Sequence, residues 1–343
     1  MSVVIPTYNR AHILRRALES AIRECHPGDE VLVVDDGSTD DTEAVVASFG
    51  PPIRYLRGEH RGAGAARNTG IRAAAGDLVA FLDSDDEWIT GKLSWQRAIL
   101  EAFPSILFLF SNYGRIDESG ERLAHQICQV PGRRGERRGW SEILGPGISS
   151  ATVPGIPKSA PPFTLYTGRL YETLIHFFWY VCTCTLIARR KEAGDALHFA
   201  EDVATFEDLE CFARLAQRGE AGYMDCDTFW NHGHRGVRLT DADPVARVDA
   251  VVKIIERIWG SDQKYLQMHR HEYEGVMDKH RRNKVRYLLS MGRQQEARWE
   301  LDYFFAKPWG YSLLSRVPRV FLAWLVGISH LYHSLIGQPG SLK

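Results

Sequence analysis

Short apolar runs and amphipathic segments alternate along the N-terminal part of the chain. The apolar runs are typical of buried strands and cover residues 2–5, 30–34, 53–56 and 79–82. Segments with a helical spacing of apolar positions lie between them, at residues 11–24, 40–49 and 65–75. Strands joined by helices predict an α/β fold with a Rossmann-like, mostly parallel sheet flanked by helices.

The remainder of the chain is less regular and ends in a helical extension. A strand is expected at 106–111, a strand-like run at 178–188 and an amphipathic helix at 206–218. Residues 131–162 are rich in Gly and Pro and contain several Arg residues, a composition typical of a long mobile loop. After about residue 240 the spacing is mostly helical, which predicts a helical C-terminal region at 241–343.

The strand at 79–82 ends in a cluster of carboxylates, Asp83, Asp85 and Asp86. Polar turns at 7–9 and 35–38 should lie at the same edge of the sheet, because parallel strands end together there. Crowded like charges need a cation, and hard oxygen ligands suit Mg²⁺ or Mn²⁺, which often also contact a substrate phosphate. Asp83 and Asp85 should point to one side of the strand, and Asp86 is expected to cap the next helix. A solvated turn is the structural alternative.

A glycine-containing turn, Gly62-Ala63-Gly64, precedes a helix that carries Arg67. The glycines either serve only the turn or let the backbone approach a ligand whose phosphates face Arg67. No Gly-Lys-Ser/Thr follows, which disfavours a phosphate-loop NTPase. The first strand ends in Pro6-Thr7-Tyr8-Asn9 instead of a glycine-rich turn, which disfavours a dinucleotide-binding fold.

A second acidic pair, Glu207-Asp208, opens the predicted helix at 206–218. An amphipathic helix with acidic residues near its N-terminus is the structural alternative. Glu201-Asp202 is a rival pair a few residues earlier. His232 and His234 follow in a segment with Gly and Arg, a combination that favours contact with an anion or a metal.

Composition indicates an ordinary globular protein. The 343 residues are 44% hydrophobic and 25% charged, and the net charge of −1 gives no indication of nucleic acid as a partner. The six cysteines include no Cys-x-x-Cys pair, which indicates reduced thiols in the cytoplasm. An apolar strand begins almost at the first residue, and we therefore expect no secretory signal.

Four motifs together resemble glycosyltransferase family 2, the inverting nucleotide-sugar transferases with the GT-A fold. They are VVIPTYNR at 3–10, VVDDGSTD at 33–40, GAGAARNTG at 62–70 and FLDSDD at 81–86. The resemblance is dense over residues 2–88 and resumes at about 182–240. It implies a nucleotide-sugar-binding half at 1–115 and an acceptor-binding half with the catalytic base at 116–240. None of the motifs specifies the sugar.

The resemblance also implies roles for individual residues. Asp83 and Asp85 stand at the family's DxD motif, with Asp85 the stronger candidate for a ligand of Mn²⁺ or Mg²⁺. Glu207 and Asp208 stand at its Glu-Asp pair, and Asp208 is the expected base. The residues implied to hold the donor are Pro6, Thr7, Tyr8, Asn9, one of Asp35 and Asp36, Arg67, Asp83 and His234. His232 is the alternative to His234.

The implied reaction transfers a sugar from a nucleoside-diphosphate donor to an acceptor hydroxyl, with inversion in a single displacement. Asp208 would remove the acceptor's proton, and a divalent ion would neutralise the leaving diphosphate. A glycan or lipid-linked acceptor of cell-envelope polysaccharide synthesis is expected. Two alternatives are a nucleotidyltransferase, which would typically have a glycine-rich, basic first turn, and a nucleotide-sugar-binding protein without transferase activity, which the two intact carboxylate sites disfavour.

Apolar positions from Val320 to Leu335 follow helical spacing, with Arg316 and Arg319 beside them. The run is broken too early for a spanning helix, which needs about 20 apolar residues. The segment either docks on the catalytic domain or lies on the inner surface of the membrane. We therefore expect a cytoplasmic protein, peripheral on the membrane in the second case.

Overall fold

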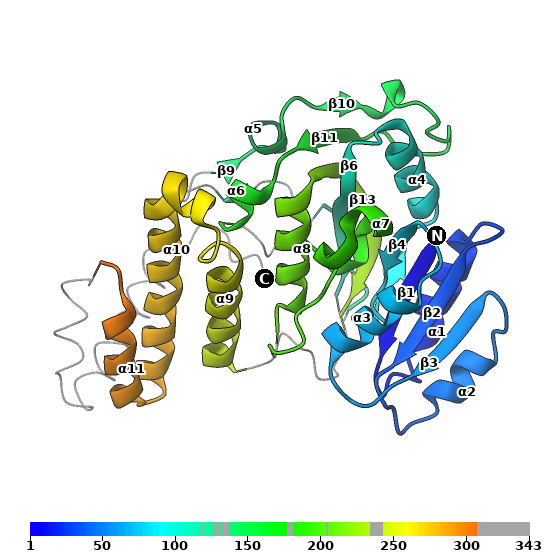
Figure 1. The fold of residues 1–343 in the computed structure, drawn as a ribbon. Helices are drawn as coiled ribbons and strands as arrows, with labels where there is room; N and C mark the ends of the chain where they lie inside the picture. The colour runs from blue at the N-terminus through cyan, green and yellow to red at the C-terminus, as the bar shows by residue number, and fades with distance from the viewer. Residues whose placement is uncertain are drawn as a thin grey trace. The chain divides into compact units, whose positions relative to one another are not determined.

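The computed structural model describes residues 1–117, 119–125, 130–131, 137–176, 181–203, 205–233 and 243–306. The chain divides into two compact units, residues 1–237 and residues 238–343, and each is described by itself (Figure 1).

The first unit is built on an eleven-stranded sheet with the order β10-β11-β13-β6-β12-β4-β1-β2-β3, in which β5 pairs with β13 and β7 with β6. Its strands are β1 (Ser2–Thr7), β2 (Glu30–Asp35), β3 (Ile53–Arg57), β4 (Leu78–Phe81), β5 (Glu87–Trp88), β6 (Ile106–Ile116), β7 (Arg122–Leu123), β10 (Ile148–Ser149), β11 (Thr164–Gly168), β12 (Ile187–Arg189) and β13 (Glu220–His232). A separate two-stranded sheet consists of β8 (Val130–Pro131) and β9 (Arg137–Arg138).

The strands β4, β1, β2 and β3 are parallel, and β6 and β13 are parallel to each other. β12 joins these two groups because it runs antiparallel to both β4 and β6. The predicted α/β fold with a mostly parallel central sheet is therefore confirmed. The carboxyl ends of β1, β2 and β4 meet at one edge, as expected from their parallel direction.

Helices pack against the sheet through apolar stripes. In α1 (Leu14–Glu24) the positions Leu14, Ala17, Leu18 and Ala21 are all fully buried, which is the spacing of one helical face. The other helices of this unit are α2 (Thr42–Ala47), α3 (Ala63–Ala73), α4 (Lys92–Ala102), α5 (Trp140–Leu144), α6 (Tyr171–Leu174), α7 (Arg190–Ala193) and α8 (Glu207–Arg218). Short 3₁₀ turns are η1 (Ser150–Thr152), η3 (Thr183–Thr185) and η4 (Gly194–Ala196).

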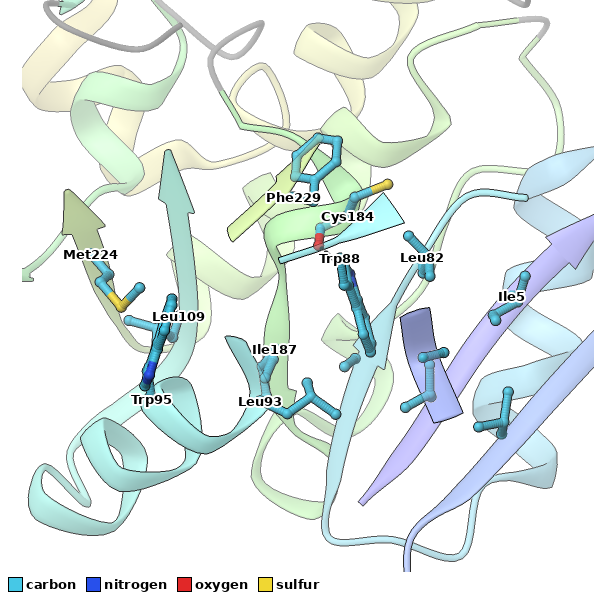
Figure 2. Close-up of a cluster of buried hydrophobic side chains, with 14 of the residues drawn as sticks. Ile5, Leu82, Trp88, Leu93, Trp95, Leu109, Cys184, Ile187, Met224 and Phe229 are labelled. Atoms are coloured by element: carbon cyan, nitrogen blue, oxygen red, sulfur yellow. Dashed lines mark hydrogen bonds between the residues drawn. The ribbon is translucent and has the colours of Figure 1, made fainter. Parts of the chain in front are cut away.

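A single core continues beneath both groups of parallel strands. Figure 2 shows Ile5 of β1, Ile187 of β12 and Leu109 of β6 in this core, with Trp88 between them. The sheet edge that carries the acidic residues therefore rests on closely packed side chains.

Two expectations for the middle of the chain are wrong. Among the described residues of the run expected at 178–188, Thr183–Thr185 is a 3₁₀ turn, and the strand begins at Ile187 and ends just beyond the run, at Arg189. The turn closes because the backbone N–H of Thr185 donates to the carbonyl of Cys182 at 3.0 Å. From Trp140 onward the expected mobile loop is ordered, because the buried Trp140 ring stacks on Tyr223 with centroids 4.0 Å apart.

The second unit is helical, which confirms the predicted C-terminal extension over its described residues. It contains α9 (Pro244–Ile258), α10 (Gln263–Ser290), α11 (Gln294–Glu300) and η6 (Leu301–Tyr303). Its core is formed by Val245, Val285, Leu288, Ala297 and Phe304. Within the described ranges no helix is both long and apolar enough to cross a membrane. The segment at 317–335, for which docking or membrane binding is expected, lies outside the described residues.

Candidate active site

Arg67 joins the two acidic sites that the sequence predicts separately. Its guanidinium donates from Nη2 to Asp83 Oδ1 at 2.6 Å and from Nη1 to Glu207 Oε1 at 2.7 Å. The Arg67 side chain is 5% exposed, Glu207 is 11% exposed and Asp83 is 31% exposed. Burial disfavours the charged form of Arg67, but Asp83 and Glu207 outweigh this and raise its pKa. Helix α3, the end of β4 and the start of α8 therefore meet at one cation.

Asp208 lies beside this cluster and keeps some solvent exposure. Burial, followed by the charge of Glu207, raises its pKa to about 7, although Arg67 and a hydrogen bond from Thr183 act in the opposite direction. The Thr183 hydroxyl donates to Asp208 Oδ2 at 3.1 Å. A carboxyl group that titrates near neutral pH is suited to accept a proton.

The close approach of α3 and α8 depends on a glycine and on a residue with a left-handed backbone conformation. A Cβ on Gly64 would lie 2.4 Å from the carbonyl oxygen of Ala200 and 3.4 Å from Glu207 Cβ, so only glycine fits there without a shift. Phe206, which precedes α8, has φ +62°, a conformation that is unusual for a residue other than glycine. It turns the chain so that Glu207 and Asp208 open the helix.

Asp86 does not cap the next helix, contrary to expectation, because that helix begins at Lys92. The Asp86 carboxylate is buried and accepts hydrogen bonds from Asn231 Nδ2 at 3.1 Å, from the His232 backbone N–H at 3.2 Å and from Cys184 Sγ at 3.3 Å. Burial, with the charges of Asp85 and Asp83, raises the pKa of Asp86. The residue therefore ties the acidic segment to β13.

The ends of β1 and β2 lie at the same sheet edge as the end of β4, because the three strands are neighbours and parallel. Pro6 and Thr7 pair with Val34 and Asp35 in the parallel ladder. Thr7 Oγ1 is buried and has no hydrogen-bond partner in the described part of the chain. A buried hydroxyl without a partner at a strand end is suited to contact a ligand.

The two turns that follow these strands are linked to each other. The backbone N–H of Asn9 donates to Ser38 Oγ at 2.8 Å, and the N–H of Thr39 donates to Asn9 Oδ1 at 2.8 Å. Asp35 accepts a hydrogen bond from the Ser38 N–H at 2.8 Å and another from the Tyr55 hydroxyl. Asp35 thereby fixes the turn that begins at its own strand end.

Asp36 organises the loop before α3. It accepts hydrogen bonds from the backbone N–H groups of Arg61 and Gly62 at 2.9 and 2.8 Å, and His60 Nδ1 lies 2.9 Å from its Oδ2. The His60 ring stacks on the ring of Tyr8 with centroids 4.0 Å apart. The sequence pattern does not single out His60, because only the fold brings it to Tyr8.

The remaining predicted residues fall in different places. His234 lies outside the described residues, whereas His232 Nε2 lies 3.1 Å from Glu87 Oε2. In the rival acidic pair Glu201 accepts hydrogen bonds from Asn68 and Arg61, and Asp202 is exposed. Thr183 and Cys184 are site residues that the sequence pattern also misses, since hydroxyl and thiol groups in an apolar run resemble core positions.

The acidic segment fits a hard cation through its carboxylates. Ligand atoms of Asp83, Asp86 and Cys184 lie within 4.8 Å of one another. Burial raises the pKa of the Cys184 thiol well above its usual value, and its Sγ donates to Asp86, so it is not a thiolate ligand. Oxygen atoms of Asp83 and of its neighbour Asp85 are the ligands that Mg²⁺ or Mn²⁺ prefers.

Comparison with solved structures agrees on the fold. The crystal structure of S. aureus TarS 1–349 in complex with UDP-GlcNAc superposes with a TM-score of 0.60 at 18% identity, over 96% of this chain and 91% of that chain. At this identity the likeness shows the fold alone.

Sequence comparison gives the family. The model of Glycosyl transferase family 2 matches residues 2–167. An uncharacterized glycosyltransferase of Rickettsia conorii is 37% identical over 196 residues, 57% of this chain and 31% of that protein. The Escherichia coli UDP-Glc:alpha-D-GlcNAc-diphosphoundecaprenol beta-1,3-glucosyltransferase WfgD is 36% identical over 121 residues, 35% of this chain and 47% of that protein. The matches span less than half the length of these relatives. The match over residues 2–167 agrees with the predicted resemblance to this family.

Proposed function

We propose that the protein is an inverting glycosyltransferase that moves a sugar from a nucleoside-diphosphate donor to an acceptor hydroxyl. The observation that carries the proposal is the Arg67 bridge, because it places Asp83 of the acidic segment beside the Glu207-Asp208 pair. A relative that uses UDP-Glc and a diphosphoundecaprenol-linked acceptor supports a glycan or lipid-linked acceptor of envelope polysaccharide synthesis.

Asp208 is the proposed base. It takes the proton of the acceptor hydroxyl, whose oxygen attacks the anomeric carbon from the face opposite the leaving group. The new carbon–oxygen bond forms as the bond to the diphosphate breaks, and the electron pair leaves with the nucleoside diphosphate. A positioned base of this kind typically accelerates a reaction by about 10²–10⁴-fold. Glu207 holds Arg67 in place beside it.

The donor is proposed to lie along the strand ends. Thr7 and Tyr8 would contact the nucleoside together with Asp35 or Asp36. The buried Thr7 hydroxyl, which has no hydrogen-bond partner in the described part of the chain, supports this proposal. Arg67 and Asp83 would face the diphosphate, and Asp85 and Asp83 would hold Mn²⁺ or Mg²⁺. The bound ion would neutralise negative charge on the diphosphate. The contributions of Pro6, Asn9 and His234 to donor binding remain predictions, as do the division into halves at 1–115 and 116–240 and the membrane contact of 241–343.

Calorimetric titration with UDP, GDP, dTDP and CMP, with and without Mn²⁺, tests the donor site. We expect one nucleotide to bind in a metal-dependent manner, and Asp85→Ala to abolish that dependence. The matched control is Asp77→Ala, because Asp77 is an exposed carboxylate just before β4 that pairs with Lys191 on the surface. Absence of binding for all four nucleotides would contradict the donor site.

Asp208→Asn tests the base independently. It should nearly abolish sugar transfer and leave nucleotide binding intact. Turnover close to that of the wild type would reject Asp208, and Asp202 or Glu207 would then be the residue to replace.

A further inference from the structure

The 3₁₀ turn η3 stands between the acidic segment and the start of α8. On one side the Thr183 hydroxyl donates to Asp208 Oδ2 at 3.1 Å. On the other side Cys184 Sγ accepts a hydrogen bond from the Asp83 backbone N–H at 3.3 Å and donates to Asp86 Oδ2 at 3.3 Å. Two consecutive residues therefore contact the two acidic groups of the site.

Fully buried side chains of the core hold the turn in place. Trp88 Nε1 donates to the carbonyl oxygen of Cys184 at 3.1 Å, and Gln96 Nε2 donates to that of Thr185 at 2.9 Å. Lys92 in turn donates to the Gln96 side chain and lies 4.5 Å from the centroid of the Trp88 ring. Figure 2 shows Cys184 directly beside Trp88 and Phe229 in this packed core. Such a support leaves the turn little freedom to shift.

The Thr183 hydrogen bond favours the ionised carboxylate of Asp208, and it engages Oδ2. The same hydrogen bond fixes the orientation of the carboxylate. The other oxygen, Oδ1, is the one proposed to receive the acceptor's proton. The charged and titratable groups that act on Asp208 from the surrounding elements are Glu207 and Cys211 of α8, Arg67 of α3 and Asp83 after β4.

We propose that η3 is a positioning element, in which Thr183 orients Asp208 and Cys184 holds the acidic segment at a fixed distance from it. The proposal rests on the proposed function, because it assumes that the base must be held at a fixed position relative to the donor site. It adds two residues that act through the acidic side chains and backbone that they contact.

Thr183→Val and Thr183→Ser form a matched pair that tests the first half. Valine keeps the shape of the side chain without the donor, and we expect kcat for UDP release from UDP-glucose or UDP-N-acetylglucosamine to fall about tenfold with KM nearly unchanged. The carboxyl-carbon NMR titration of Asp208, which needs no substrate, should move to higher pH. Serine restores the hydroxyl and should restore both values. An unchanged titration in Thr183→Val, or a serine variant that behaves like valine, would overturn the role of Thr183.

Cys184→Ala tests the second half, with Cys226→Ala as the control because Cys226 is a buried cysteine of β13 whose thiol donates to the carbonyl oxygen of Asp227. We expect Mn²⁺-dependent UDP binding to weaken several-fold in the first variant and to stay unchanged in the second. Equal affinities in the two variants would overturn the role of Cys184. Failure of the proposed function is distinguishable, since it would appear as absence of binding of all four nucleotides, UDP, GDP, dTDP and CMP, to the wild type.

Discussion

Replacement of Arg67 by Met should destabilise the protein strongly, because it leaves carboxylates without their cation. Methionine keeps an unbranched side chain of similar length and removes the charge. Glu207 is 11% exposed and loses its 2.7 Å partner, whereas Asp83 is 31% exposed and can be partly solvated. Breaking a buried ion pair by removing one partner typically costs about 3–5 kcal/mol. We expect a loss near the lower limit, about 3 kcal/mol, since only one of the two carboxylates is well buried.

Urea unfolding followed by both fluorescence and circular dichroism measures this loss, and agreement of the two probes checks that one transition is observed. Arg72→Met is the matched control, because Arg72 is an exposed residue of the same helix whose Nη2 donates to Thr69 Oγ1 at 2.9 Å. It should change the free energy of unfolding by no more than about 0.5 kcal/mol.

The charge argument also predicts how the lost stability can be recovered. If uncompensated carboxylate is the cause, Glu207→Gln in the Arg67→Met background should recover part of the lost stability, and the deficit should shrink at low pH, where the carboxylates are protonated. A loss equal to that of Arg72→Met would refute the reasoning. A full loss that neither Glu207→Gln nor low pH relieves would show that packing, including the contact of Arg67 with the Phe199 ring at 5.2 Å, is responsible instead.

Two further changes test packing and burial. Gly64→Ala should lower the free energy of unfolding by about 1–3 kcal/mol, because the added Cβ would lie 2.4 Å from the Ala200 carbonyl oxygen. Gly275→Ala in α10 should raise it by about 0.5–1 kcal/mol, because no described atom lies within 4 Å of the added Cβ. Equal effects of the two substitutions in thermal unfolding would contradict this. Burial lowers the pKa of Lys92 to about 7, so between pH 7 and 10 the unfolded chain binds a proton that the folded protein does not. The contribution of Lys92 to stability should therefore rise with pH in this window, by up to about 1.4 kcal/mol per pH unit, and it is measured as the difference in unfolding free energy between the wild type and Lys92→Met in urea titrations at several pH values.

The strand ends of the donor side can be predicted from the sequence because they follow from local rules. Apolar runs mark β1, β2 and β4, and parallel strands end at one edge, so the sequence pattern by itself places Thr7, Asp35 and Asp83 together. The Arg67 bridge cannot be predicted in the same way. It depends on α8 reaching α3 across 140 residues of sequence separation, and that approach is decided by one missing Cβ at Gly64.

The acidic segment shows where local rules fail. Asp83, Asp85 and Asp86 are chemically equivalent neighbours, and helix capping is a reasonable local role for the last of them. In the fold Asp86 instead receives hydrogen bonds from β13 and from η3, two elements that the sequence places about a hundred residues or more away. The donors of Asn231, His232 and Cys184 hold the Asp86 carboxylate in the interior, where a buried carboxylate needs hydrogen-bond partners. Asp83, which is 31% exposed, pairs with Arg67 instead. The different roles of these identical side chains are therefore set by the hydrogen-bond donors around them.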